Sequence, residues 1–351
     1  MSKYWSKLAA RLEPYVPGEQ LKDKKYIKLN TNENPYPPSP KAIEAIKAAA
    51  DSSLKLYPDP VAADLKSTLA KNYGLKSSQV FVGNGSDEVL AFSFMAFFNT
   101  DEEVLFPDVT YSFYPVYANI FSINFRLVPL EEDFTVPVKE FFNSEGGVII
   151  PNPNAPTARA IAAKDIERIL VNNKEKVVII DEAYVDFGAE SVVNLVDKHE
   201  NLLVVQTLSK SRSLAGLRVG WAFGQEHLIE GLTRVKDSIN SYTLDRLALI
   251  GAAAAIEDVD YFEETRKKIV STRERITANL QNLGFNIIPS KANFIFISHE
   301  TVPAEHIFKR LKEEGVLVRY FKKPGIDNYL RVSIGTDAEM DAMIEKLQTI
   351  Q

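Results

Sequence analysis

Apolar residues along this chain follow two spacings. Short, mostly apolar runs are separated by longer stretches in which apolar residues recur every three or four positions. A strand buried on both faces appears as an apolar run, whereas the wider spacing marks the inner face of a helix. The pattern therefore predicts helices alternating with the strands of a mostly parallel sheet, with strands at 79–83, 103–106, 125–128, 148–150, 177–180 and 202–205.

The first forty residues lack this pattern because prolines interrupt them repeatedly. A proline has a restricted φ and no N–H to donate, so these segments favour neither a helix nor strand pairing. We expect residues 1–38 to form an arm that lies against the rest of the molecule. The regular pattern starts at Ser39, where Pro40 suits a first helical turn, and a second helix is expected through Leu65 and Leu69.

The pattern changes again after residue 240. A long helical pattern with charged faces precedes two strands, a helix, two more strand segments and a closing helix, at 261–283, 285–288, 294–297, 303–314, near 317, at 329–334 and from 336. Fewer helices separate consecutive strands here, which favours a smaller α+β domain. We therefore predict a large α/β domain over 39–240 and a small C-terminal domain over 241–351.

Length, charge and composition exclude several classes of protein. With 351 residues and about 150 residues per domain, roughly two domains are expected. The 41 basic and 47 acidic residues leave a net charge of −6 without a long run of one sign, so a nucleic-acid-binding face is not expected. No stretch approaches the ~20 apolar residues of a membrane span, and we expect a cytoplasmic protein. The absence of cysteine excludes disulfides, thiolate metal sites and cysteine nucleophiles. Only four histidines remain as possible soft metal ligands, so we expect no metal site.

Ligands of open α/β sheets bind beyond the carboxyl ends of the strands, so the residues after each predicted strand are candidates for function. The first strand leads through Gly83 and Gly85 into a helix expected to start near Ser86, followed by Asp87. Glycines allow close approach of the backbone, and a helix N-terminus offers N–H groups, so this turn can hold a phosphate. The alternative is a tight turn in which Ser86 is the helix N-cap.

Two charged residues follow later strands. Asp181 comes directly after the fifth strand, where a buried carboxylate is unfavourable unless it has a cationic partner. The alternative is that Asp181 caps a helix or lies in a loop. Lys210 follows the sixth strand among hydroxyls and small residues. A desolvated lysine near other cations is a nucleophile for carbonyl groups, and Ser209 and Arg218 add donors suited to a phosphate. The alternative for this segment is a solvated basic loop.

A proline-rich segment, 151–157, follows the fourth strand and can present an asparagine amide at the sheet edge. Together, these strand ends predict an enzyme that binds pyridoxal 5′-phosphate. Lys210 would bond to the aldehyde carbon of this cofactor, and Asp181 would pair with its pyridine nitrogen. Tyr184 and an asparagine amide would hydrogen-bond its phenolic oxygen, and Tyr111 would stack on its ring unless it is an ordinary buried aromatic residue.

Motifs over almost the whole chain carry a further resemblance; they lie at 14–18, 29–35, 57–59, 83–88, 110–111, 152–157, 181–184, 207–218 and 330–335. They resemble those of fold type I, aspartate-aminotransferase-like enzymes, and specifically the histidinol-phosphate aminotransferase family. The resemblance implies a large α/β/α domain that binds pyridoxal phosphate and a smaller C-terminal domain. It also implies transfer of an amino group between L-histidinol phosphate and 2-oxoglutarate, in histidine biosynthesis, by a homodimer with shared active sites.

The resemblance further implies roles for particular residues. It implies that the cofactor phosphate is held by backbone groups of Ser86 and Asp87 and by Ser209 and Arg218, together with Tyr57 from the partner subunit. It implies substrate binding by Tyr15, Asn32, Arg319 and Arg331. Of these, Arg331 would take the carboxylate of the amino-acid donor, and Arg319 would help to bind the phosphate of the substrate.

One loop departs from the family pattern. Relatives commonly have Asn-Pro-Thr-Gly there, whereas this chain has Ala155 before Pro156 and Ala158 after Thr157. Asn154 is then the best candidate for the amide that binds the cofactor. Ala158 would cost about 1 kcal/mol if its φ were positive, and little otherwise.

The residues leave other functions open. Aromatic amino-acid aminotransferases and decarboxylases of amino-acid phosphates use the same cofactor, and the fold does not determine which bond to Cα breaks. A non-catalytic relative would be expected to lose Lys210 or Asp181, and both are present. A nicotinamide-dependent dehydrogenase is disfavoured, because no strand leads into a clean Gly-x-Gly-x-x-Gly turn with an acidic residue about twenty positions later.

Overall fold

The computed structural model describes residues 2–13, 19–21 and 23–350. Tyr15, for which the sequence predicts substrate binding, lies outside the described residues. Among those residues, no helix combines the length and the apolar character that crossing a lipid bilayer would require.

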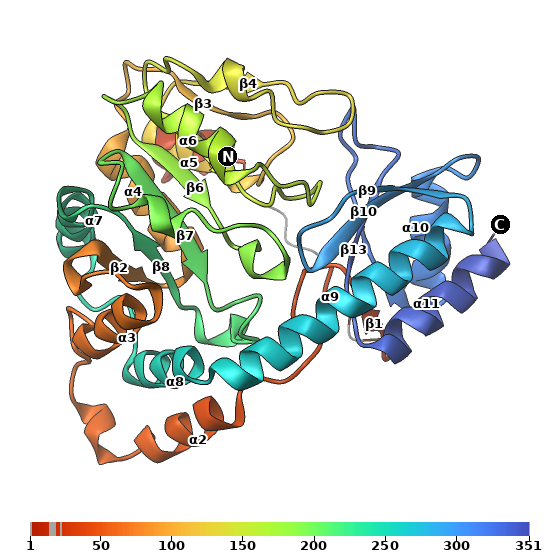
Figure 1. Ribbon diagram of the computed structural model, residues 1–351, viewed down its shortest axis with the longest axis horizontal. Helices are drawn as coiled ribbons and strands as arrows, with labels where there is room; N and C mark the ends of the chain where they lie inside the picture. The colour runs from red at the N-terminus through yellow and green to blue at the C-terminus, as the bar shows by residue number, and fades with distance from the viewer. Residues whose placement is uncertain (1, 14–18, 22, 351) are drawn as a thin grey trace.

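A seven-stranded sheet forms the centre of the larger part of the molecule (Figure 1). The six strands predicted for this region are all present, and a seventh joins them. In sheet order the strands are β2 (Val80–Gly83), β8 (Gly220–Phe223), β7 (Leu202–Thr207), β6 (Val178–Asp181), β5 (Val148–Pro151), β3 (Val104–Pro107) and β4 (Phe125–Val128). The five strands from β7 to β4 are parallel, so their carboxyl ends lie at one edge of the sheet.

The sequence pattern did not predict β8, which runs antiparallel to both of its neighbours, β7 and β2. Only residues 208–219 separate it from β7. A parallel return would need room for a helix and two loops, so the chain instead turns back along β7. As a result β8 lies between β7 and β2, and its first residue, Gly220, pairs with both Thr207 and Gly83.

Helices cover both faces of this sheet (Figure 1). One face packs against α2 (Pro40–Ala49), α3 (Ala63–Tyr73), α6 (Ala163–Val171) and α8 (Arg246–Glu257). The other face packs against α4 (Gly85–Phe97), α5 (Phe113–Phe121) and α7 (Glu226–Ile239). Consecutive residues of one strand point into opposite cores. Ile179 lies in the core under α4, α5 and α7, Ile180 lies in the core on the other face, and both residues are fully buried. Burial on both faces explains why these strands appear as unbroken apolar runs in the sequence.

A smaller antiparallel sheet lies at the C-terminal side, in the order β12 (Arg319–Tyr320), β13 (Leu330–Ser333), β10 (Phe294–His299) and β9 (Phe285–Ile288). Three helices pack on it: α9 (Val259–Gln281), α10 (Ala304–Glu313) and α11 (Asp337–Ile350). The long α9 runs across the molecule from the larger layers towards this sheet (Figure 1). The domain boundary predicted after residue 240 stays a prediction; α8, which follows it, buries its apolar face in the core of the seven-stranded sheet.

The arm contains regular structure that its prolines did not predict. A short helix, α1 (Lys7–Arg11), precedes the first prolines, and β1 (Ile27–Lys28) pairs in parallel with β11 (Val316–Leu317). Residues 19–34 contain no proline, so β1 retains the N–H groups that a ladder needs. Leu29 then enters the core of the small sheet, which anchors the following residues beside the pocket described next.

Candidate active site

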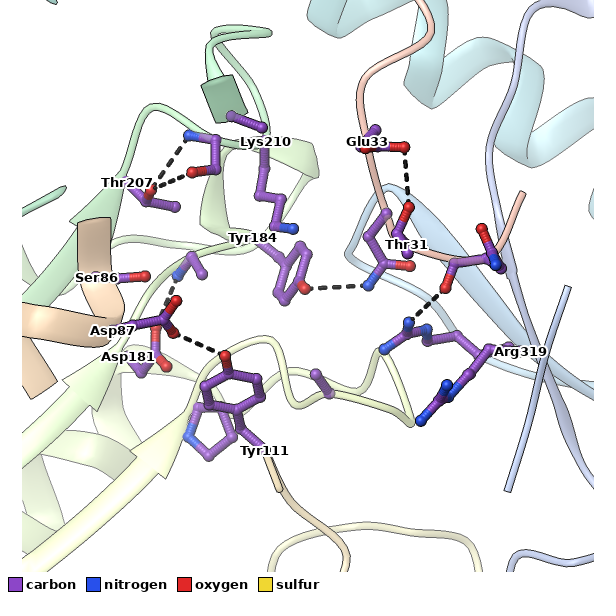
Figure 2. A pocket seen from close by; sticks show the side chains of 18 of the residues that line it. Thr31, Glu33, Ser86, Asp87, Tyr111, Asp181, Tyr184, Thr207, Lys210 and Arg319 are labelled. Carbon is purple, nitrogen blue, oxygen red and sulfur yellow. Dashed lines mark hydrogen bonds between the residues drawn. The ribbon is translucent and has the colours of Figure 1, made fainter. Parts of the chain in front are cut away.

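A pocket of about 260 Å³ lies at the carboxyl ends of β5, β6 and β7, between these strands, the arm and the small sheet (Figure 2). Most of the residues predicted from the sequence line it: Ser86, Asp87, Tyr111, Asp181, Tyr184, Ser209, Lys210, Arg218, Asn32, Arg319 and Arg331. Asn154 and Tyr57 do not line it. Parallel strands bring their carboxyl ends together, which is why residues far apart in the chain meet here.

The turn after β2 forms a cradle at the N-terminus of α4. The helix begins at Gly85 with Asn84 as its N-cap residue, so the alternative of an N-cap at Ser86 is wrong. Gly85 has a φ of +80°, and a Cβ on it would come within 2.6 Å of the Arg218 guanidinium. The first N–H groups of a helix have no partner within the helix, and together with Arg218 they make this end of the pocket suited to a phosphate.

Gly220 of β8 packs directly against the backbone at the start of α4, which forms this cradle. A Cβ on Gly220 would lie 2.3 Å from the Ser86 nitrogen. We expect Gly220→Ala to displace the start of α4 and to weaken binding of pyridoxal phosphate at least about tenfold, a loss of ~1.4 kcal/mol. Titration of the apoprotein with the cofactor measures this change. Gly216→Ala is the matched control, because nothing lies within 4 Å of a Cβ there. Unchanged affinity in Gly220→Ala would show that the close approach is not needed.

Asp181 ends β6 with its carboxylate at the floor of the pocket. It is only 5% exposed, and it accepts hydrogen bonds from the Tyr114 hydroxyl at 2.9 Å and from the Ala183 N–H at 3.1 Å. Burial raises the pKa of Asp181 to about 6, although Tyr114 acts in the opposite direction. A protonated ring nitrogen would be a favourable partner for this carboxylate. Tyr114, on α5, was not found from the sequence, since nothing local distinguishes it from other core aromatic residues.

Lys210 lies in the turn between β7 and β8, and its amine points into the pocket (Figure 2). The amine is 5.6 Å from the ring centre of Tyr184. The side-chain amide of Asn34, in the arm, donates to the Lys210 carbonyl at 3.0 Å and thereby holds this turn. At the end of β7, the Thr207 hydroxyl donates to the Ser209 hydroxyl at 3.0 Å, which places both hydroxyls at the pocket wall.

Tyr111 lies beside Asp87 at the wall of the pocket (Figure 2). Its hydroxyl donates to Asp87 at 2.7 Å, and Asp87 also pairs with Arg218 at 3.2 Å. Burial and the neighbouring Asp87 carboxylate raise the pKa of Tyr111 well above its usual value, so the phenol stays neutral. Its ring is therefore anchored at the pocket wall, where stacking on a planar ligand stays a prediction.

The proline-rich loop after β5 differs from the prediction. Ala155, and not Asn154, lines the pocket. Both amide hydrogens of Asn154 are engaged, one with the Val109 carbonyl at 2.9 Å and one with the Thr157 hydroxyl at 3.0 Å. The prolines of this loop do not indicate which of these two neighbouring residues faces the pocket. The predicted contact between Asn154 and the cofactor is therefore not supported. Ala158 has a φ of 65°, so the conformational cost anticipated for it applies.

The arm and the small sheet form the opposite wall. Arg319 lies on the far side of the pocket from Ser86 and Asp87 (Figure 2). Arg331, on β13, donates to the Asn30 carbonyl of the arm at 2.9 Å. The pocket thus has cationic groups at both ends, which suits a ligand or ligand pair with two separate anionic groups.

Thr31 and Glu33 also line this wall, although only their motif was noticed in the sequence. Burial acts to raise the pKa of Glu33, but hydrogen bonds from Lys28 and Thr31 outweigh it, and the pKa lies below its usual range. Glu33 is therefore a carboxylate at neutral pH and balances part of the positive charge of the pocket.

Tyr57 lies on the surface before α3, away from the pocket, with 78% of its area exposed. Its ring stacks on Tyr242 with 4.6 Å between centroids. Several apolar side chains near it in sequence are also exposed: Leu54, Leu56 and Val61. Exposed apolar groups in one region are typical of a protein–protein contact.

Comparisons with known proteins match this chain to aminotransferases over nearly its whole length. The family model described as aminotransferase class I and II matches residues 24–347. A histidinol-phosphate aminotransferase of Clostridium acetobutylicum is 63% identical over 348 residues, which cover 99% of this chain and 99% of that protein. The enzyme of the same name from Clostridium beijerinckii is 56% identical over 350 residues, covering 100% and 98%.

Two solved structures show the same fold. A histidinol-phosphate aminotransferase of Sinorhizobium meliloti, in complex with pyridoxal-5′-phosphate, has a TM-score of 0.88 at 23% identity, covering 100% of this chain and 99% of that one. An aspartate aminotransferase mutant of Thermus thermophilus has a TM-score of 0.81 at 18% identity, covering 100% of both chains. The central sheet, its two helical layers and the separate small sheet are thus common to these proteins.

Proposed function

The chain belongs to the aminotransferase class I and II family, and on that premise we propose that it transfers an amino group between L-histidinol phosphate and 2-oxoglutarate. The products would be imidazole acetol phosphate and L-glutamate, in a step of L-histidine biosynthesis. The observation that carries this proposal is the 63% identity to the histidinol-phosphate aminotransferase of Clostridium acetobutylicum over 99% of both chains.

The cofactor of this enzyme is pyridoxal 5′-phosphate, and the pocket offers a partner for each polar part of it. We assign its phosphate to the cradle of Ser86, Ser209 and Arg218, which glycines keep open. We assign its ring nitrogen to Asp181 and its aldehyde carbon to Lys210. When bound, the cofactor supplies an electrophilic carbon and a ring that withdraws electrons from the substrate's Cα.

The residues of the chain then have separate tasks. Lys210 would form the covalent attachment to the cofactor and, once released from it, would move the proton at Cα of the substrate. Asp181 would keep the ring nitrogen of the cofactor protonated, and Tyr184 would donate a hydrogen bond to its phenolic oxygen. We assign the carboxylate of glutamate to Arg331 and the phosphate of histidinol phosphate to Arg319, so that both substrates use the same end of the pocket.

Substrate preference tests this proposal. Values of kcat/KM should be compared for histidinol phosphate, phenylalanine and tyrosine, with 2-oxoglutarate as the acceptor. We expect histidinol phosphate to be preferred at least about tenfold, since a charge-assisted contact to its phosphate is worth ~1.5–3 kcal/mol. Equal efficiency on all of these donors would overturn the narrow assignment and favour an aromatic aminotransferase. Release of carbon dioxide from an amino-acid phosphate would favour a decarboxylase.

We further propose a cytoplasmic homodimer in which Tyr57 of each subunit reaches the cofactor phosphate of the other. The exposure of Tyr57 and its apolar neighbours supports this arrangement. Mixing Tyr57→Phe subunits with Lys210→Ala subunits provides the test, because in the heterodimer one site carries both substitutions and the other carries neither. We expect activity to reappear on mixing, up to about half of the wild-type activity per heterodimer.

Two measurements make this mixing experiment decisive. Tyr57→Phe alone must weaken retention of the cofactor, and heterodimer formation must be confirmed with two differently tagged subunits. If both conditions hold and mixing restores no activity, each site is built from a single subunit.

A further inference from the structure

Asn32, in the arm, forms a hydrogen bond with Tyr184. Its side-chain nitrogen donates to the Tyr184 hydroxyl oxygen at 3.0 Å (Figure 2). Asn32 is 1% exposed, so water has almost no access to the amide. The contact joins residues 152 positions apart in the chain, so no local pattern predicts it.

Ser333, at the end of β13, determines which way this amide points. Its hydroxyl oxygen accepts the Asn32 backbone N–H at 2.8 Å, and its own hydrogen is donated to Asn32 Oδ1 at 3.1 Å. The amide oxygen thus faces a donor, and the amide NH₂ has to face Tyr184. Asn293 adds a hydrogen bond to the Asn32 carbonyl at 3.0 Å, so the backbone is held as well.

The backbone of Asn32 has a φ of 56°, in the left-handed region. Asparagine and aspartate adopt this conformation more readily than other side-chain-bearing residues. The position therefore requires a residue that adopts a positive φ readily and that also carries an amide, and asparagine meets both requirements.

A phenol has one hydrogen. Because Asn32 donates to the Tyr184 oxygen, the Tyr184 hydrogen must point elsewhere, and the hydroxyl lines the pocket. The methyl side chain of Ala155 cannot donate a hydrogen bond there, and the amide hydrogens of Asn154 are used elsewhere. We propose that Asn32, oriented by Ser333, is a positioning residue that makes Tyr184 a hydrogen-bond donor towards the phenolic oxygen of the cofactor. This inference rests on the proposed function, and it replaces the substrate-binding role predicted for Asn32.

The test measures the pH midpoint of the absorbance change of the bound cofactor. A hydrogen bond donated to the phenolic oxygen stabilises its anionic form and lowers this midpoint. Asn32→Asp keeps the shape and the backbone preference but presents an acceptor, so the Tyr184 hydrogen turns away from the pocket. We expect the midpoint to rise by about one pH unit, the equivalent of one charge-assisted hydrogen bond. Tyr184→Phe should raise it by a similar amount.

A double-mutant comparison separates positioning from the added charge. In the Tyr184→Phe background, Asn32→Asp should raise the midpoint by less than a third of its effect in the wild-type background. Asn30→Asp is the matched control, because Asn30 is buried in the same arm segment but its amide donates to the Glu19 carbonyl. It should give the same shift whether Tyr184 is present or replaced by phenylalanine.

Each outcome decides between the possibilities. An equal effect of Asn32→Asp in both backgrounds would overturn the inference alone. Ser333→Ala provides a neutral second variant if Asn32→Asp does not fold, and an unchanged midpoint in Ser333→Ala would likewise overturn the inference. A wild-type protein that binds no pyridoxal phosphate would overturn the proposed function, and this inference with it.

Discussion

Lys210→Ala is expected to abolish steady-state transamination while leaving non-covalent binding of pyridoxal phosphate. Among the described residues, Lys210 is the only lysine that lines the pocket, so no other amine is positioned to replace it. The substitution would remove both of the roles proposed for Lys210, the covalent attachment of the cofactor and the movement of the proton at Cα. The loss should be on the order of 10⁴-fold or more, since positioned proton transfer alone contributes about 10²–10⁴-fold.

Borohydride reduction followed by peptide mapping checks the assignment directly. The wild-type protein should carry the reduced cofactor on Lys210, and the variant should carry none. Lys323→Ala is the control, because its amine is engaged with the Asp108 carbonyl at 2.6 Å outside this pocket. A label on any lysine other than Lys210 would refute the proposed role.

Asp181→Asn is expected to slow transamination by about 3 kcal/mol of barrier, a hundredfold or more. An amide cannot stabilise a protonated ring nitrogen as a carboxylate does, so the cofactor withdraws electrons less strongly. The side chain has nearly the same shape, and Tyr114 can accept a hydrogen bond from the new amide, so the fold should be retained. A rate close to that of the wild type would show that Asp181 does not act on the ring.

The same substitution should stabilise the apoprotein. Burial raises the pKa of Asp181 to about 6, above the value of about 3.9 that an aspartate has in an unfolded chain, so between these pH values the folded state holds a proton that the unfolded state has lost. The stability of the wild type therefore falls as pH rises from about 4 to 6, and the cost stays constant above that. We expect Asp181→Asn to be more stable above pH 7 by on the order of 3 kcal/mol, and the difference to vanish near pH 4.

Denaturant unfolding of the cofactor-free proteins over this pH range measures the effect. Asp258→Asn gives a control of opposite sign, because hydrogen bonds from Lys41 and Ser39 lower the pKa of Asp258. That variant should be less stable than the wild type at neutral pH, with the difference shrinking as pH falls. If Asp181→Asn showed the same sign as Asp258→Asn, the argument from burial would be wrong.

The alternation of strands and helices could be predicted because most strands of the seven-stranded sheet are buried on both faces. Such strands appear in the sequence as short runs of apolar residues. Candidate residues at the carboxyl ends of the strands followed from the same pattern, since parallel strands bring Asp181 and Lys210 to one edge. The turn glycine Gly85 was also recognisable locally, and in the structure a Cβ on it would come within 2.6 Å of the Arg218 guanidinium.

Contacts between distant segments were decided only by the tertiary structure. The insertion of β8 beside β2, the pairing of β1 with β11 and the choice of Ala155 over Asn154 at the pocket depend on which surfaces meet. The hydrogen bonds from Tyr114 to Asp181 and from Asn32 to Tyr184 belong to the same class. The sequence by itself determined the local periods, the strand ends and the reactive side chains, because these depend on neighbours along the chain. The tertiary structure alone decided which partners orient those side chains, because a hydrogen bond depends on distance in space and not on separation in sequence.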